Sequence, residues 1–501
     1  MAQALFVILL FTVLTKAISF LKEMIVASRF GTSAEYDLFL EISALPLSVA
    51  ALLTYTIIYA YTPVFQSNKN NVGNYLATKI LINSAMKWLL SSFVFMILTL
   101  ILLFLFKFKT IGINIYIENQ KIFDIGLLVS LIVFAQCLIS FLTIPLISNS
   151  KNLLLCLAPL GGAVSSVILL YLNPNNDSYT LSFLVLASYF GNLLIMISSL
   201  LFLFKTKAFK GGPVSSNTRP MKLKEIAITS TFCIFLIEAG PQISGFFERQ
   251  VLNSRFFQQG VLSSLVYAQV LLGFFVSIGV LVVVRMLLPK FSGNSNLNSD
   301  DMRKFYFLLT LFIFLMFFGA LFKSNTIVFL AFYSGNFSLI DVNRVADLLS
   351  ILSIVIIFDI LYSVLASKYY SLQSFKALIF AGAAFFFTRI IVIVLAAYLS
   401  DVRVIAMAIV SASAIRLLLL LSLYYQEHGL SHQVKEYLTY AVKIFMILFV
   451  YFFLIENSRQ NIQVNKVDLL MQELLLLFPL AILAFLYFLY FHLKKRKRDD
   501  F

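Results

Sequence analysis

Charged residues are scarce in this chain. Only 12% of its 501 residues are Asp, Glu, Lys or Arg, and 61% are hydrophobic, whereas about 25% charged residues is usual in a soluble domain. A water-soluble protein of this length needs much more polar surface, so the composition excludes a soluble enzyme. The 53 Phe residues suit a surface that faces lipid. The sequence therefore predicts an all-α polytopic membrane protein.

Cysteine and histidine are also few. The three cysteines, Cys137, Cys156 and Cys233, lie in apolar runs without metal-ligand spacing, which is typical of small buried hydrophobic residues. His428 and His432 are four residues apart in a polar segment with no third ligand nearby, so we interpret them as solvated. We expect no metal site and no resident cofactor.

The motifs of the common enzyme classes are absent. The chain has no G-x-S-x-G, no H-E-x-x-H, no P-loop and no dinucleotide-binding fingerprint. The missing P-loop argues against an ATPase. What remains is a transporter without a cofactor, driven by the membrane potential or by a gradient of Na⁺ or H⁺.

Long apolar runs are abundant. A bilayer core requires about 20 apolar residues per helix, and fourteen runs meet this length. They lie near 4–28, 37–64, 81–106, 122–147, 152–172, 179–204, 226–249, 260–288, 305–331, 345–367, 377–399, 403–425, 438–456 and 470–492. The first run has no basic residues ahead of its apolar core, as a signal peptide would, so we expect it to be a retained helix.

The net charge of +15 fits basic loops on one side of a membrane better than a nucleic-acid partner. The cations concentrate in the connecting segments that would be cytoplasmic if the N-terminus is inside. An even number of spans then places the C-terminus inside as well. The two richest segments contain Lys205, Lys207, Lys210, Arg219, Lys222 and Lys224, and Lys494, Lys495, Arg496, Lys497 and Arg498.

The longest loop divides the first twelve spans into two sets of six. Its Gly-Gly-Pro and Ser-Ser-Asn segments are typical of a flexible linker. We therefore predict a six-helix lobe over 1–210, a basic cytoplasmic linker over 211–225 and a second six-helix lobe over 226–430. Two further helices and a basic tail would occupy 431–501. Two such lobes around a site at the membrane midplane are a transporter architecture, although the loop could also be an ordinary loop in one bundle.

Charged and polar side chains inside the spans are costly, so they indicate a cavity or a partner on another helix. In the second span, Asp37, Glu41, Ser48 and Tyr55 share one face, and Pro46 can bend the helix. The other candidates are Lys16, Lys22 and Glu23 in the first span, Glu238 and Gln242 in the seventh, Gln269 in the eighth, Asp359 in the tenth, Arg389 in the eleventh and Arg416 in the twelfth. Pairing between helices is the alternative for each, and Asp37 and Glu41 could also lie at the outer interface.

One stretch carries a family resemblance. TVLTKAISFLKEMIVASRFGTSAEYDLFLEISALP resembles the opening of the MurJ/MviN lipid II flippases of the multidrug/oligosaccharidyl-lipid/polysaccharide (MOP) exporter superfamily. The shared features are the pair Lys22-Glu23, the turn Phe30-Gly31, Asp37 with Phe39, and Leu45-Pro46. The segments FYSGNFSLID, LYSVLASKYYSLQSFKA and LVYAQVLLGFFVSIGVLVVVRMLLPKFS are similar to later family segments, in the same order. Fourteen spans is also the number in this family.

This chain departs from the family where the family cavity is rich in arginine. The matching positions Lys16 and Lys22 keep a positive charge but lose the bidentate fork of arginine. Ala50 and Ala51 stand where the family has twin arginines, and Gln269-Val270 replaces an Asp-Arg pair. Another polyprenyl-linked saccharide is therefore an open alternative to lipid II.

The resemblance implies a two-lobe, MATE-like bundle with two C-terminal helices that could hold a prenyl tail. It implies alternating access that moves a polyprenyl-diphosphate-linked saccharide across the bacterial cytoplasmic membrane, with the protein acting as a monomer among membrane lipids. On this hypothesis seven residues form the substrate-binding site. Lys16 and Lys22 contact the diphosphate, and Gln242 and Gln269 bind sugar or peptide groups. The acids Glu23, Asp37 and Glu41 balance the charges of the lysines or switch with protonation or a bound cation. Glu238, Asp359, Arg389 and Arg416 would serve coupling or charge balance.

Two other functions are possible from the residues. In a cation-coupled multidrug exporter of the same superfamily, Asp37, Glu41 and Glu238 would form the coupling site. A membrane glycan polymerase would need a large outer loop with catalytic residues, and the longest predicted outer loop, 107–121, is short.

Overall fold

The computed structural model describes residues 2–108, 116–148, 152–205, 223–254, 257–292, 299–371, 375–428, 444–450 and 452. Almost all of this part is helical. The elements are α1 (Ala2–Phe30), α2 (Ala34–Val72), α3 (Asn74–Phe108), α4 (Tyr116–Ser148), α5 (Asn152–Leu172), α6 (Ser178–Lys205), α8 (Leu223–Leu252), α9 (Val261–Ser292), α10 (Ser299–Phe322), α11 (Ser324–Phe332), α12 (Leu339–Leu352), α13 (Val355–Ser371), α14 (Phe375–Leu399) and α15 (Val402–His428).

The first twelve predicted spans each coincide with one helix or with a bent pair of helices. The ninth predicted span is the pair α10 and α11, which meet at an angle of 82°, and the tenth is the pair α12 and α13, which meet at 41°. The ninth run is interrupted at its bend by the polar residues 323–326, which a count of apolar length alone passes over. The prediction of an all-α membrane protein is confirmed.

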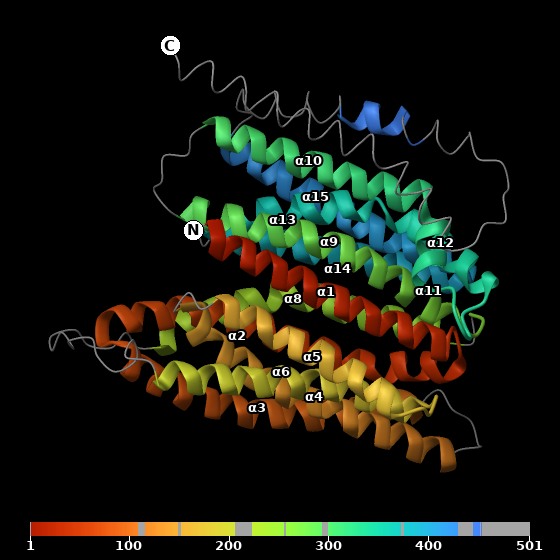
Figure 1. The fold of residues 1–501 in the computed structure, drawn as a ribbon, viewed down its shortest axis with the longest axis horizontal. Coiled ribbons are helices and arrows are strands. Elements are labelled where there is room, and N and C mark those ends of the chain that lie inside the picture. Colours follow the sequence, from red (N-terminus) through yellow and green to blue (C-terminus); the bar gives the residue numbers. More distant parts are fainter. Residues whose placement is uncertain are drawn as a thin grey trace.

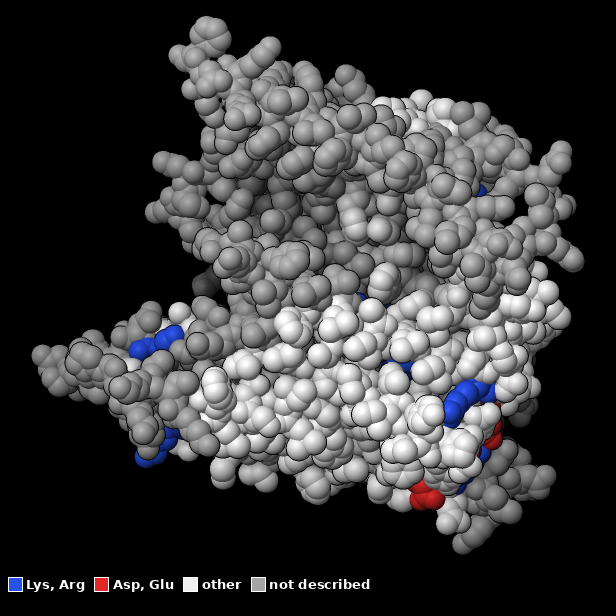
Figure 2. Space-filling view, in the orientation of Figure 1, with Lys and Arg blue, Asp and Glu red and all other residues white. Residues whose placement is uncertain are grey.

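Six of the described helices are long and apolar enough to cross a membrane, and the two bent pairs raise this number to eight. The count of fourteen spans stays a prediction. Figure 2 shows that the charged side chains visible on the described part gather mostly toward the two ends of the helices, with a largely uncharged belt between them. Such a belt is what a lipid-facing surface requires.

The helices form two groups (Figure 1). In the first, α2 packs against α3 and α4, α5 packs against α6, and α1 packs along α5. In the second, α14 packs against α8 and α15, and α9 packs against α12 and α13. The groups meet where α2 lies against α8 and where the end of α1 touches α11. We refer to them as the first and second lobes.

The two lobes share buried aromatic side chains near the α1–α2 turn. Tyr267 is fully buried there, with its ring 5.2 Å from that of Tyr36, 5.1 Å from that of Phe332 and 5.3 Å from that of Phe337. The Tyr267 hydroxyl donates a hydrogen bond to the Gly31 carbonyl at 3.1 Å. Residues from α2, α9, α11 and the following turn therefore join the lobes at this end.

Residues 211–222 of the predicted linker lie outside the described residues. The remaining predicted linker residues, 223–225, are the start of α8, which begins at Leu223. The fourteenth predicted span also lies outside the described residues. Of the thirteenth, Ile444, Leu448 and Phe452 pack with Phe317 and Phe318 of α10.

Helices α5 and α6 approach closely because small residues face each other. A methyl group added at Gly162 would collide with the carbonyl oxygen of Ser188, and one added at Gly191 would lie 2.7 Å from the carbonyl oxygen of Gly161. The Ser165 hydroxyl spans the interface and donates to the Ala187 carbonyl at 2.6 Å. Close backbone contact through small residues is a common basis of helix association in membranes.

We expect Gly162→Ala to destabilise the protein by about 1–3 kcal/mol, because the added methyl group must push α5 and α6 apart. Gly245→Ala is the matched control, since nothing lies within 4 Å of a methyl group at that position. Thermal unfolding of both variants in the same detergent measures the difference. Equal midpoints would contradict the importance of the close α5–α6 contact.

Candidate functional site

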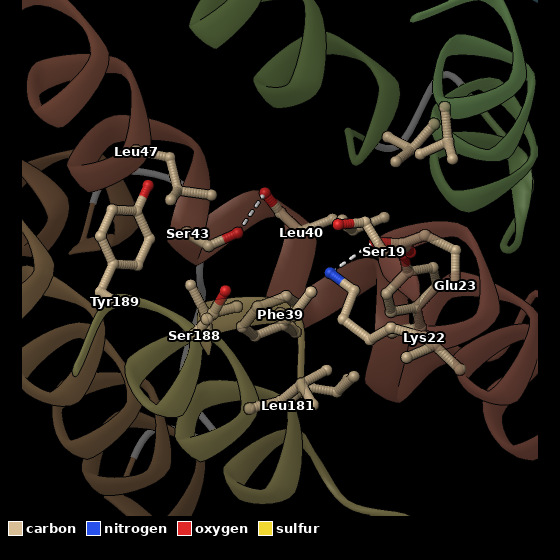
Figure 3. Close-up of a pocket in the computed structure, with 18 of the residues that line it drawn as sticks. Ser19, Lys22, Glu23, Phe39, Leu40, Ser43, Leu47, Leu181, Ser188 and Tyr189 are labelled. Carbon is tan, nitrogen blue, oxygen red and sulfur yellow. Dashed lines mark hydrogen bonds and ion pairs between the residues drawn. The ribbon is translucent and has the colours of Figure 1, made fainter. Parts of the chain in front are cut away.

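A cavity of about 490 Å³ lies mainly within the first lobe and reaches α8 and α9 of the second (Figure 3). Its walls come from α1, α2, α4, α5 and α6 together with residues of α8 and α9. The volume falls in the range of ligand-binding pockets, about 300–1,000 Å³.

The lining residues follow helical periodicity on three helices. On α6 they are Leu181, Leu184, Val185, Ser188, Tyr189 and Asn192; on α2 they are Tyr36, Phe39, Leu40, Ser43 and Leu47; on α1 they are Ser19, Lys22, Glu23 and Val26. Spacings of three and four residues place each set on one face of its helix. The cavity is thus built from one stripe of each helix.

One end of the cavity is charged. Lys22 Nζ lies 2.6 Å from Glu23 Oε1, and both side chains are about one-fifth exposed. Arg249 of α8 also lines the cavity, and its guanidinium donates to the Leu40 carbonyl at 3.4 Å. Arg249 forms no ion pair within the described part of the chain. This charged end, made of Lys22, Glu23 and Arg249, carries one more positive than negative charge.

The other end of the cavity is polar but uncharged. It is formed by Gln136, Ser188, Tyr189 and Asn192. Gln136 Nε2 donates to Thr54 Oγ1 at 2.6 Å. Figure 3 shows Ser188 and Tyr189 on one side of the view and Lys22 with Glu23 on the other, with Phe39 between them. We call Gln136, Ser188, Tyr189 and Asn192 the neutral end.

Asp37 and Glu41, two of the predicted substrate ligands, are buried at the junction of the lobes and are not among the residues that line this cavity. The Asp37 carboxylate accepts hydrogen bonds from the backbone N–H groups of Gly260 at 2.7 Å and Ser263 at 2.8 Å. It thereby caps the N-terminus of α9. The Glu41 carboxylate accepts a hydrogen bond from the Asn253 side chain. Both acids tie α2 to the second lobe.

The α1–α2 turn adds further bonds at the same end. Thr32 Oγ1 donates to Asp341 at 2.6 Å, and the backbone N–H of Asn336 donates to the Ser28 carbonyl at 2.8 Å. Gly31 and Gly335 have φ values of +53° and +56°. A methyl group at Gly31 would lie 2.6 Å from the Asn336 carbonyl oxygen, and one at Gly335 would collide with the Ser28 carbonyl. Together with the bonds of Asp37 and Glu41, these bonds form what we call the interlobe contact.

The two arginines predicted in the second lobe, Arg389 and Arg416, each pair with an acid. Arg389 of α14 lies 2.5 Å from Glu248 of α8, a side chain that is only 3% exposed, and Gln269 Nε2 donates to the other Glu248 oxygen at 2.7 Å. Arg416 of α15 lies 2.9 Å from Asp359 of α13. Buried ions require this kind of pairing, and the roles of Arg389, Asp359 and Arg416 in coupling or charge balance stay predictions. Gln269 is bonded to Glu248 and does not line the cavity.

Three predicted residues lie elsewhere. Lys16 is half-buried on α1, roughly 9 Å along the helix from Lys22, and does not line the cavity. The backbone carbonyl of Gln242 accepts from Ser48 Oγ at 3.4 Å, which joins α2 to α8. Glu238 is half-buried on α8. The roles predicted for these three side chains stay predictions.

Sequence reasoning missed Arg249 and the whole neutral end. Arg249 stands at the last position of its predicted span, where a cation usually marks the membrane interface. Ser188 and Asn192 are uncharged, so a search for intramembrane charges passes over them. The signal that could have found them is the four-residue spacing of Ser188 and Asn192, with Tyr189 between them, in the middle of a predicted span.

We expect Arg389→Met to destabilise the protein by about 3–5 kcal/mol, because it leaves Glu248 as an uncompensated buried charge. The control is Arg403→Met. Arg403 pairs with Asp347 at 3.2 Å, but their side chains are 61% and 58% exposed, so we expect a loss below about 1 kcal/mol. Thermal unfolding in one detergent compares the two, and the double variant Glu248→Gln with Arg389→Met should recover part of the loss. Equal effects of the two single variants would contradict this interpretation.

Comparisons with known proteins bear on this architecture. A search of curated proteins gave no match. A solved structure of lipid II flippase MurJ in an inward closed conformation has a TM-score of 0.73 at 17% identity, over 95% of this chain and 98% of its own. A MOP superfamily transporter from Pyrococcus furiosus has a TM-score of 0.55 at 12% identity, over 84% and 94% of the two chains. A mutant of the Vibrio cholerae MATE transporter VcmN has a TM-score of 0.53 at 13% identity, over 85% and 96%.

Structural likeness at this level of identity shows the fold. The weaker likeness to the MATE transporter does not favour the multidrug alternative. A family model described as lipid II flippase MurJ matches residues 26–471, which is most of the chain. This protein therefore belongs to the MurJ family of lipid II flippases.

Proposed function

We propose that this flippase moves lipid II, or a closely related polyprenyl-diphosphate-linked saccharide, across the bacterial cytoplasmic membrane by alternating access of its central cavity. The observation that supports this most is the charged end of the cavity. In a chain of this family, Lys22 and Arg249 line one polar space that both lobes enclose.

The physical task explains why cations belong in this cavity. A saccharide head with a diphosphate cannot cross hydrocarbon unaided, because its polar groups would lose their hydration without replacement. Arginine matches phosphate oxygens with a fork of donors, and lysine acts as a point charge. We therefore assign the diphosphate to the space between Lys22 and Arg249.

Glu23 competes with the diphosphate for Lys22, since the two side chains are already paired at 2.6 Å. Protonation of Glu23, or a cation beside it, would free Lys22 for the substrate. This competition offers a route for coupling transport to H⁺, to Na⁺ or to the membrane potential. The transporter would need no resident cofactor and no catalytic chemistry.

The orientation follows from the basic segments, with both termini in the cytoplasm. The α1–α2 turn then lies on the outer side, and the interlobe contact would close the outer end of the cavity. Transport would require Asp37, Glu41 and Thr32 to release their partners on the second lobe. The prenyl tail would stay in lipid and reach the head through a lateral opening, with the last two helices beside it, and one copy of the chain would suffice.

Complementation tests the substrate. In a bacterium depleted of its own lipid II flippase, this protein should restore growth and the exposure of lipid II on the outer leaflet, once its membrane insertion is confirmed. Lys22→Ala and Arg249→Ala should each lower the rate of lipid II exposure by about 10- to 100-fold, the effect of one lost charge-assisted bond. Lys16→Ala should also impair transport, but less, because Lys16 does not line the cavity.

Variant levels in the membrane must match the wild-type level for this comparison. Wild-type transport by both Lys22→Ala and Arg249→Ala would contradict the assignment of the diphosphate. Failure of the inserted wild-type protein to rescue growth would contradict lipid II as the substrate and would direct the assay to other polyprenyl-diphosphate saccharides.

A further inference from the structure

The neutral end of the cavity contains a buried acceptor that lacks a donor. The Oδ1 atom of Asn192 is inaccessible to solvent and has no hydrogen-bond partner among the described residues. Buried polar atoms are nearly always paired, because an unpaired one keeps the full cost of its lost hydration. Since Asn192 lines the cavity, rotation of its side-chain amide can turn Oδ1 toward a donor on a ligand there.

The surroundings of Asn192 suit an uncharged, hydroxyl-rich ligand. Ser188 and Tyr189 share its stripe on α6, and Gln136 of α4 also lines the cavity. No Asp, Glu, Lys or Arg belongs to this end of the lining. Phe39 lies between the two ends and, at 5% exposed, contributes only a small apolar contact. Hydrogen-bonding groups around an apolar surface match a sugar ring, which has polar edges and apolar faces.

The positions of the two ends match the order of groups in the substrate. The lining stripe of α6 runs roughly 16 Å from Leu181 to Asn192. Along it the side chains change from apolar, beside the charged end, to polar (Figure 3). A sugar linked directly to a diphosphate at Lys22 and Arg249 can therefore extend toward Ser188 and Asn192.

We propose that the neutral end is the saccharide subsite of this flippase. The sugar next to the diphosphate donates a hydroxyl or acetamido hydrogen to Asn192 Oδ1. This inference rests on the proposed function, and it gives the sugar-binding role to the first lobe instead of Gln242 and Gln269. The subsite selects for a neutral, hydrogen-bonding head group attached to the diphosphate.

The test measures the binding of two probes to the full-length protein in lipid nanodiscs. One probe is undecaprenyl diphosphate, and the other is the same lipid with one N-acetylhexosamine on the diphosphate. Asn192→Leu should weaken binding of the sugar-bearing probe by about three- to tenfold, the effect of one neutral hydrogen bond. Binding of the sugar-free probe should not change. Lys22→Ala should weaken both probes.

The control for changes in α6 is Leu194→Met, whose position is 65% exposed and faces away from the cavity; it should alter neither probe. An equal loss of both probes in Asn192→Leu would overturn the saccharide subsite, because it would indicate a distorted cavity. Unchanged binding of both probes would also overturn it, since water would then supply the donor. If the wild-type protein binds neither probe, the proposed function itself fails.

Discussion

The buried carboxylate of Asp37 is the constraint on which the arrangement of the lobes depends. It is only 4% exposed, so its charge must be balanced by donors, and it finds them in the first backbone N–H groups of α9. This one interaction fixes the start of α2 against the second lobe. Gly31 and Gly335, which lie in the neighbouring turns, then let the backbones of the two lobes come into close contact.

The cost of burying charge also explains why the two lobes differ. In the second lobe the predicted ions neutralise each other, as Arg389 does with Glu248 and Arg416 with Asp359. In the first lobe, among the residues that the structure describes, Lys22 pairs only with its neighbour Glu23, and Arg249 reaches into the same cavity from α8. The excess positive charge in the cavity is therefore that of Arg249, and it favours a negative ligand there.

Much of the fold could be predicted from the sequence, because long apolar runs report helices directly. The bend at Lys323 was missed because the spans were counted by apolar length alone, although the polar residues 323–326 interrupt the run there. For the site, the charged and polar residues inside the predicted spans correctly indicated Lys22 and Glu23. The sequence could not distinguish a side chain that lines the cavity from one that is bonded to another helix, so Asp37 and Gln269 were also predicted to bind substrate. That distinction depends on which helices are neighbours. The segments around Gly31 and Gly335 carried the family resemblance, and their contact across the lobes appears only in three dimensions.

The central claim is that the interlobe contact must open for transport. The most direct test is to lock it in a cysteine-free protein that carries Thr32→Cys and Asp341→Cys, whose native side chains are 2.6 Å apart. A short, cleavable bifunctional thiol reagent would join them, and lipid II movement would be followed in proteoliposomes. The account predicts that cross-linking stops transport and that cleavage restores it. Undiminished transport with the cross-link intact would contradict it.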